Sequence, residues 1–199
     1  MTSVDELVME GGKLDEYGEL PVRVRNRLID RVLALLPAER KRRQFVGVLG
    51  LICAQKSWPI WLEKFPSEAE PISVIENVVK AVFDETPTPD AYRRLDKLKV
   101  LIDSKLISGE EEEYFSASYA GLACWAAARD VIYGRQDWMT AGESEQEIDP
   151  DDWDASFYAS IAVTGSSGWD RNGVDHARQK FWIWYLREAV PSAFARVSE

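Results

Sequence analysis

The sequence predicts an all-α protein that folds as a single compact bundle of about seven to nine helices. Apolar residues recur at spacings of three and four, which is the pattern of a helix with one buried face. Proline and glycine separate these segments, and alternating strand patterns joined by two-residue glycine turns are nearly absent. With 199 residues, the chain is long enough to form its own core, burying about 70% of its unfolded surface.

The first twenty residues are the only poorly patterned end of the chain. We expect residues 1–20 to be loosely ordered and residues 21–199 to form one helical domain. A first helix is predicted from Pro21 to Leu36, because proline suits the first helical position and Pro37 ends the pattern.

The second predicted helix follows Pro37 and has an apolar face made by Phe45, Val48, Leu49, Ile52 and Cys53. We expect Ser57 to cap a short turn that contains Trp58, Pro59 and Trp61. A third helix is predicted from the buried pattern of Val74, Ile75, Val78, Val79 and Val82, although β-branched residues lower helix propensity.

The middle of the chain predicts two further helices. One begins at Thr88 and Pro89 and ends at Gly109, with a core face made by Tyr92, Leu95, Leu98, Leu101 and Ile102. The next follows four glutamates and ends at Gly134. It is crowded with small residues that allow a neighbouring helix to approach closely, so we expect it at the centre of the bundle.

The last third of the chain predicts a loop, a short helix, a turn and a long helix. An acidic residue at or near Asp152 is expected to cap a helix through Phe157, Ile161 and Val163, and residues 165–168 are predicted as a turn. A final helix is predicted from about Val174 to Ala189, stopping before Pro191. This last helix is apolar nearly all round, which indicates burial on more than one side.

Charge is distributed unevenly along the chain. The net charge is −10, which disfavours general binding to nucleic-acid phosphates. Residues 21–43 nevertheless carry eight basic and two acidic side chains. Arg23, Arg27 and Arg31 share one helical stripe, and Arg40–Arg43 is a basic run. These side chains form a solvated face, an internal counterpart to the acids or an arm that binds nucleic acid.

The two cysteines, Cys53 and Cys124, both fall in apolar helical patterns, so neither a disulfide framework nor a paired zinc motif is predicted. The sequence begins without a signal-peptide pattern, and no uninterrupted apolar run is long enough to span a membrane. The sequence therefore predicts a cytoplasmic protein without a membrane partner.

The most polarised stretch runs from Asp137 to Asp154 and contains eight acids and no lysine or arginine. Trp138 and Trp153 lie at its two ends. An aromatic anchor surrounded by acids is typical of a surface that docks a basic protein, whereas the structural alternative is that both rings pin the loop to the bundle. The candidate partner-binding residues are Trp138, Glu143, Glu145, Glu147, Asp149, Asp151, Asp152, Trp153 and Asp154.

An enzymatic function, as a hydrolase or a metal-dependent enzyme of unknown substrate, is the rival interpretation. His176 is the sole histidine, and a mechanism based on it would use Asp170 or Asp175 with Ser166 or Ser167. The spacing matches no known catalytic motif, and the acids lack the pattern of a calcium loop. The sequence therefore predicts no catalytic residue, metal ligand or cofactor.

The closing run from Arg178 to Ala193, RQKFWIWYLREAVPSA, resembles the last helix of the fifth family of immunity proteins of bacterial polymorphic toxin systems. Its typical pattern is a basic residue, then Phe-Trp-x-Trp-[Trp/Tyr]-Leu, then Ala-Val-Pro-x-Ala. The stretch from Tyr119 to Asp130 is similar to the alanine-rich central helix of the same family. Together the two matches cover about thirty residues.

The resemblance implies a small cytoplasmic, non-enzymatic protein that is encoded beside a secreted toxin, binds that toxin and neutralises it. The matching positions have the character of core packing, so we take five positions as fold-defining: Trp125, Phe181, Trp182, Trp184 and Pro191. A toxin that cuts nucleic acid has a basic cleft, which an acidic surface can occupy. A cytoplasmic adaptor is the remaining alternative.

Overall fold

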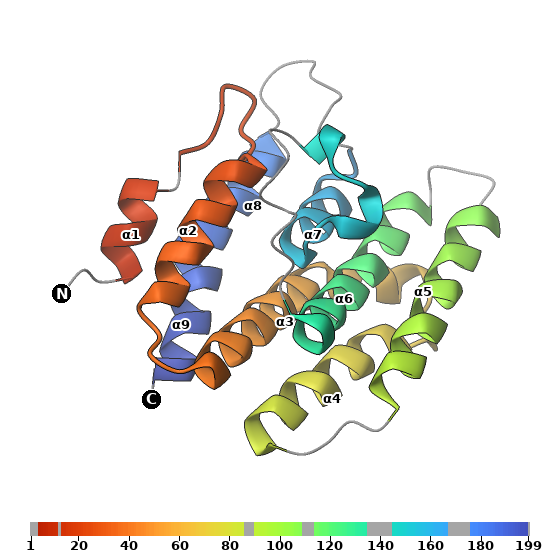
Figure 1. Cartoon of the computed structure of the whole chain (residues 1–199). Helices are drawn as coiled ribbons and strands as arrows, with labels where there is room; N and C mark the ends of the chain where they lie inside the picture. The colour runs from red at the N-terminus through yellow and green to blue at the C-terminus, as the bar shows by residue number, and fades with distance from the viewer. Residues whose placement is uncertain are drawn as a thin grey trace.

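The computed structural model describes residues 4–11, 13–85, 90–108, 114–134, 145–166 and 176–198, and the regular structure within them is entirely helical (Figure 1). The helices are α1 (Val4–Gly11), α2 (Val22–Ala34), α3 (Glu39–Lys64), α4 (Glu70–Asp84), α5 (Ala91–Ser108), α6 (Phe115–Tyr133), α7 (Ala155–Thr164), α8 (His176–Trp184) and α9 (Val190–Ser198). Short 3-10 turns η3 (Glu145–Glu147) and η4 (Pro150–Asp152) precede α7, and a π-helical turn η5 (Tyr185–Ala189) joins α8 to α9. The prediction of an all-α bundle is confirmed.

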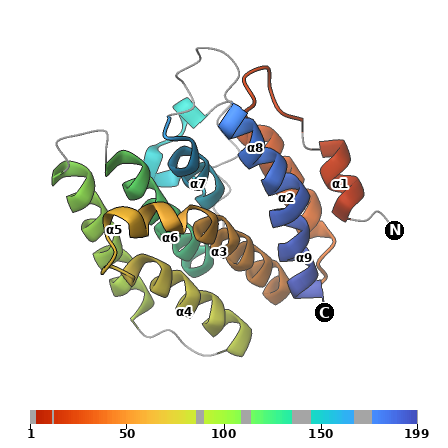
Figure 2. The same cartoon turned by 180° about the vertical axis from the view of Figure 1, so that it is seen from behind.

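Helices α3 and α6 form the centre of the bundle (Figures 1 and 2). Helix α7 packs on both of them, α4 and α5 cover one side, and the continuous α8 to α9 helix covers the other. Helix α6 is buried along nearly its whole length, from Ala117 to Val131, apart from Tyr119. The central position predicted from its small residues is therefore confirmed.

The close contact between α3 and α6 depends on a glycine. A Cβ atom added to Gly50 of α3 would lie 2.7 Å from the Cβ of Ala127 in α6, closer than two carbon atoms can pack. The absence of a side chain at this position therefore sets how closely the two central helices approach.

We expect Gly50→Ala to lower the free energy of unfolding by about 1–3 kcal/mol, because the added methyl group overpacks the α3/α6 contact. At an unhindered helix position the same change would stabilise the protein by about 1 kcal/mol. Urea unfolding shows whether Gly50→Ala lowers or raises the free energy of unfolding. The double variant Gly50→Ala/Ala127→Gly moves the methyl group to the other helix and should recover most of the loss. A single variant as stable as the wild type would contradict the prediction.

The predicted break at Ser57 is wrong, because α3 continues through Pro59 to Lys64. Proline removes the hydrogen bond to the carbonyl of Gln55, but both Gln55 and Pro59 are exposed, so water can satisfy the freed carbonyl. The Ser57 hydroxyl donates to the Ala54 carbonyl at 3.1 Å within the same helix.

The predicted stop before Pro191 is also wrong. The N–H of Val190 donates to the carbonyl of Tyr185, the five-residue spacing of a π turn, and the helix continues to Ser198 with Pro191 as its second α9 residue. Of the predicted fold-defining residues, Trp125, Phe181 and Trp182 are buried. Trp184 and Pro191 are partly buried, and the Lys56 ammonium lies 4.8 Å from the Trp184 ring centroid.

The loose order that the sequence predicts for residues 1–20 stays a prediction, but the described part of this segment contains one helix. Residues 4–11 form α1, whose Leu7 and Val8 are buried. The Asp15 carboxylate accepts the N–H groups of Tyr17 at 2.9 Å and Glu19 at 2.8 Å, which shapes the turn before α2.

Other helix ends agree more closely with the sequence. Pro21 is predicted as the first helical residue of α2, and in the structure it is the N-cap, so the helix begins one residue later, at Val22. Gly134 follows the last residue of α6. Gly165, with a φ angle of 68°, terminates α7 in the left-handed conformation. The predicted start at Thr88 and the remainder of the predicted turn after Ser166 lie outside the described residues.

Candidate functional site

The acidic stretch is described from Glu145 onward, where η3 and η4 lead into α7. Glu147, Asp149 and Asp151 are exposed and Asp152 is partly exposed. We call these four residues the acidic surface. Trp138, Glu143 and the side chain of Glu145 lie outside the described residues.

Buried groups hold the backbone of this segment against the bundle. The Trp153 ring is 5% exposed and packs edge-on against Phe157, with ring centroids 4.9 Å apart. The Arg129 guanidinium of α6 donates to the carbonyl of Trp153 at 3.1 Å and also to the carbonyl of Asp151. The Tyr158 hydroxyl donates to the carbonyl of Pro150. The acidic surface is therefore carried on a fixed backbone.

The carboxylates of the acidic surface act on one another. Asp149 accepts the N–H of Asp151 at 2.9 Å, and the Lys99 ammonium of α5 lies 3.0 Å from the Asp151 carboxylate. Partial burial raises the pKa of Asp152. Arg129 opposes this shift, while the neighbouring charges of Asp149 and Asp151 add to it. Burial is thus the main cause of the raised pKa, and repulsion between neighbouring carboxylates is a smaller one.

Trp153 and Asp154 have structural roles in this fold. Trp153 belongs to the hydrophobic core, which matches the alternative that its ring pins the loop. Asp154 is the N-cap of α7 and accepts the N–H of Phe157 at 2.9 Å, so the predicted acidic cap is confirmed and assigned to this residue. The partner-binding role that the sequence predicts for the other acids stays a prediction.

Asp154 also forms an ion pair with Arg25, with 2.7 Å between Nε and Oδ2. The Arg25 side chain is 2% exposed, donates to the Leu20 carbonyl at 2.9 Å and lies 5.1 Å from the ring centroid of Trp182. Burial would raise the pKa of Asp154, but Arg25, the Ser156 hydroxyl and the Phe157 N–H outweigh it and lower that pKa.

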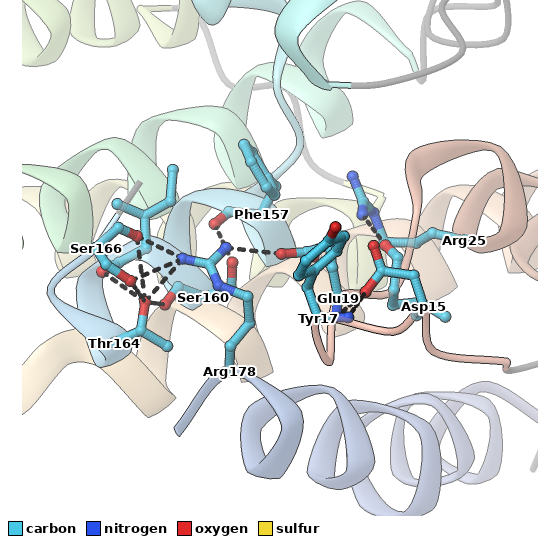
Figure 3. A network of polar contacts seen from close by, with 11 residues as sticks. Asp15, Tyr17, Glu19, Arg25, Phe157, Ser160, Thr164, Ser166 and Arg178 are labelled. Atoms are coloured by element: carbon cyan, nitrogen blue, oxygen red, sulfur yellow. Dashed lines mark hydrogen bonds and ion pairs between the residues drawn. The ribbon is translucent and has the colours of Figure 1, made fainter. Parts of the chain in front are cut away.

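A second buried arginine ties the N-terminal turn to the last helix (Figure 3). Arg178 of α8 lies between Glu19 and the end of α7, with 2.7 Å from its Nη1 to the Glu19 carboxylate. On its other side it donates to the Thr164 hydroxyl at 3.1 Å and to the carbonyl of Ser166. The contact fixes the segment before α2 against α7 and α8.

Sequence reasoning missed these buried arginines. Arg25 is counted within a basic stretch, yet it lies off the stripe of Arg23, Arg27 and Arg31, which are exposed. Its place among the apolar positions Val22 and Ile29 is the signal that could have identified a buried cation.

The basic run at the start of α3 is largely engaged within the chain. Arg40 pairs with Glu85 and donates to the Phe83 carbonyl at 2.6 Å. Arg42 donates to the Leu36 carbonyl at 3.1 Å, and Arg43 donates to the Val131 carbonyl at 3.2 Å. The Arg40–Glu85 pair matches the alternative in which the run is an internal counterpart to the acids, whereas Arg42 and Arg43 donate to backbone carbonyls.

The residues of the enzymatic alternative are not assembled in the described part of the chain. His176 is exposed at the first residue of α8, while Asp170, Asp175 and Ser167 lie outside the described residues. The described residues hold no group of three or more His, Cys, Asp or Glu side chains placed to bind a metal. Both cysteines are buried and free, and burial raises the pKa of each thiol.

Helix α3 is long and apolar enough to cross a membrane by length and composition alone. Core helices of soluble proteins share these properties, and here Phe45, Cys53 and Trp61 are fully buried within the bundle.

The described residues define a small protein whose regular structure is all helical. The family model for immunity protein Imm5 matches residues 10–192, and the chain therefore belongs to the Imm5 immunity protein family. No curated protein matches the chain. The family confirms the resemblance seen in the sequence. It makes this an immunity protein, a class that is typically not enzymatic, and implies a cognate toxin as its partner.

Proposed function

We propose that this protein neutralises its toxin by placing the acidic surface on a basic functional surface of that toxin. The observation that carries the proposal is the exposure of Glu147, Asp149 and Asp151 on a backbone fixed by Arg129. A fixed array of charges loses little conformational freedom on binding, and complementary charge accelerates association and sets specificity.

A toxin that cuts nucleic acid is the partner class that fits this surface best. Such an enzyme needs a cationic cleft for phosphates, and carboxylates at that cleft would take the place of the phosphates. Nuclease and immunity protein pairs in general are among the tightest known protein complexes, so full inhibition is attainable by binding alone.

We propose that the protein acts in the cytoplasm, where a toxin that attacks nucleic acid would be met. The two cysteines are free and buried, and the helical core is stabilised without them as a disulfide. Such a fold suits a reducing compartment.

We expect Glu147→Gln/Asp149→Asn/Asp151→Asn to slow association with the toxin about tenfold at low salt, because charge steering is lost. The probe is an inactive form of the toxin domain encoded by the reading frame beside this gene. Stopped-flow mixing measures the association rate across a salt series, in which wild type and variant should converge as salt screens the charges. Asparagine at 149 keeps the acceptor for the Asp151 N–H.

The matched control is Glu63→Gln/Glu76→Gln/Glu188→Gln, which removes the same charge from exposed positions on α3, α4 and η5. It should leave the association rate within about twofold. Equal slowing by both variants would show that net charge alone matters, and an unchanged rate in the acidic-surface variant would reject this surface as the docking site.

A further inference from the structure

Charge steering accounts for the rate at which the complex forms, but not for the contacts that hold the bound toxin in place. A few aromatic and arginine side chains near the middle of an interface usually supply most of the affinity. The sequence predicts Trp153 as such an anchor, but this residue is only 5% exposed. An anchor for a bound protein must come from aromatic side chains that reach the surface.

Tyr92 and Tyr133 form an exposed aromatic pair. Tyr92 in the first turn of α5 is 55% exposed and Tyr133 at the end of α6 is 51% exposed. Their ring centroids are 5.2 Å apart in an edge-to-face arrangement. The sequence places Tyr92 on a core face, whereas the structure places its ring at the surface. Because each ring orders the other, the pair loses little rotamer freedom when a partner covers it.

A groove of about 570 Å³ lies beside this pair, between the start of α3 and the ends of α4, α5 and α6 that meet there. Its wall is polar and apolar in about equal parts, and the apolar part is made by Val78, Ala81, Val82, Ala91, Val131 and Ile132. Its volume lies within the range of clefts that enclose a ligand, so it can take a side chain that protrudes from a partner.

Among the residues that the structure describes, one cation that lines the groove makes no ion pair. Arg40 pairs with Glu85, and Arg42 lies 3.8 Å from Glu39. Arg43 lines the groove and donates to the Val131 carbonyl, but it makes no ion pair with any residue that the structure describes. A guanidinium group has five N–H donors in a planar fork, so Arg43 can still bind a carboxylate.

The groove adjoins the acidic surface. Lys99, which binds Asp151, follows Tyr92 by seven residues on α5, about 10 Å along the helix. Arg129, which binds the Asp151 carbonyl, precedes Tyr133 by one turn on α6, about 6 Å. A protein interface of ordinary size, about 800 Å² on each partner, would cover both.

We propose that this groove and the Tyr92/Tyr133 pair form the anchor site for the toxin, and that they take an apolar side chain carried beside a carboxylate. The proposal rests on the proposed function, since it names a second part of the same interface. The acidic surface sets the rate of association, and the anchor site sets the rate of dissociation.

The test measures binding of the inactive toxin domain to Tyr92→Ala/Tyr133→Ala and to Arg43→Glu. The tyrosine variant should weaken affinity about 30-fold or more, mainly through faster dissociation and with little dependence on salt. Arg43→Glu should weaken it at least about tenfold, and Arg43→Lys less, because lysine keeps the charge but loses the fork. Circular dichroism and thermal unfolding verify that each variant is folded.

Two exposed positions serve as controls. Val100→Ala removes an apolar side chain that is 69% exposed two turns further along α5, and Arg196→Glu makes the same charge change on α9. Neither should change the affinity more than about threefold. If the wild type binds and the tyrosine and Arg43→Glu variants bind equally well, the anchor site is refuted while the proposed function stands. If the wild type fails to bind the toxin, both proposals are refuted.

Discussion

Replacing Asp154 by alanine is expected to lower the free energy of unfolding by about 3–5 kcal/mol, because it leaves the buried Arg25 charge without its partner. Arg25 is 2% exposed, and its Nε lies 2.7 Å from the Asp154 carboxylate. The change also removes the side chain that caps α7 through the Phe157 N–H. Urea unfolding, monitored by tryptophan fluorescence, gives the difference in the free energy of unfolding between the wild type and the variant.

The matched control is Asp149→Ala. Asp149 also caps a helical turn, accepting the N–H of Asp151 at 2.9 Å, but it is exposed and no buried arginine depends on it. We expect a loss of about 1 kcal/mol or less. A double-mutant cycle with Arg25→Met then separates the loss of the ion pair from the loss of the α7 cap. Since Arg25→Met removes the stranded cation, Asp154→Ala should cost much less in that background, and an equal cost in both backgrounds would contradict the role assigned to the pair.

The pH dependence of the same comparison gives a second readout. The pKa of Asp154 is lowered in the folded state, so its contribution to stability is present above the unfolded pKa, about 3.9. The contribution is lost as pH falls through the lower folded pKa. The gap in stability between wild type and Asp154→Ala should therefore be constant near neutral pH and should narrow below about pH 4.

Periodicity predicted most of the fold because each helix has a buried face that repeats every three to four residues. The two errors at proline have a common origin. The sequence does not show that Pro59 faces solvent with Gln55, or that a π turn before Pro191 lets the helix continue. Both facts depend on how the helices pack, which a local pattern does not contain.

The candidate site was less predictable, because residues of the same type have different roles. Asp149 and Asp154 lie five residues apart in one acidic stretch, yet only Asp154 meets a buried cation, and that cation is 129 residues away in sequence. Tyr92 and Tyr133 come together only because α5 packs on α6. Composition located the acidic stretch, whereas tertiary contacts decided which of its described acids are exposed and which are engaged with the core.

Trp61→Ala is expected to lower the free energy of unfolding by about 3–5 kcal/mol, because it empties a large site in the core. Trp61 is fully buried, its ring centroid lies 4.6 Å from that of Phe65, and its indole N–H donates to the Glu68 carbonyl at 2.6 Å. Helices α3 and α6 already touch at Gly50 and Ala127, so the bundle has little room to close around the void. Trp58→Ala, at the partly exposed neighbouring ring, should cost less.

A substitution at Gly121 tests whether the Trp61 ring fixes the spacing between α3 and α6. A Cβ atom at Gly121 would lie 2.7 Å from the Trp61 ring, so Gly121→Ala should destabilise the wild type. In the Trp61→Ala background that obstacle is gone, and only the Ile102 side chain, with its Cγ1 3.1 Å from the added Cβ, has to shift. The same change should therefore cost much less there, and it becomes stabilising by up to about 1 kcal/mol if Ile102 moves into the emptied space. Urea unfolding of the four proteins in this cycle measures the difference between the two backgrounds. If Gly121→Ala destabilises both backgrounds equally, the Trp61 ring is not what fixes the spacing of α3 and α6 at this point.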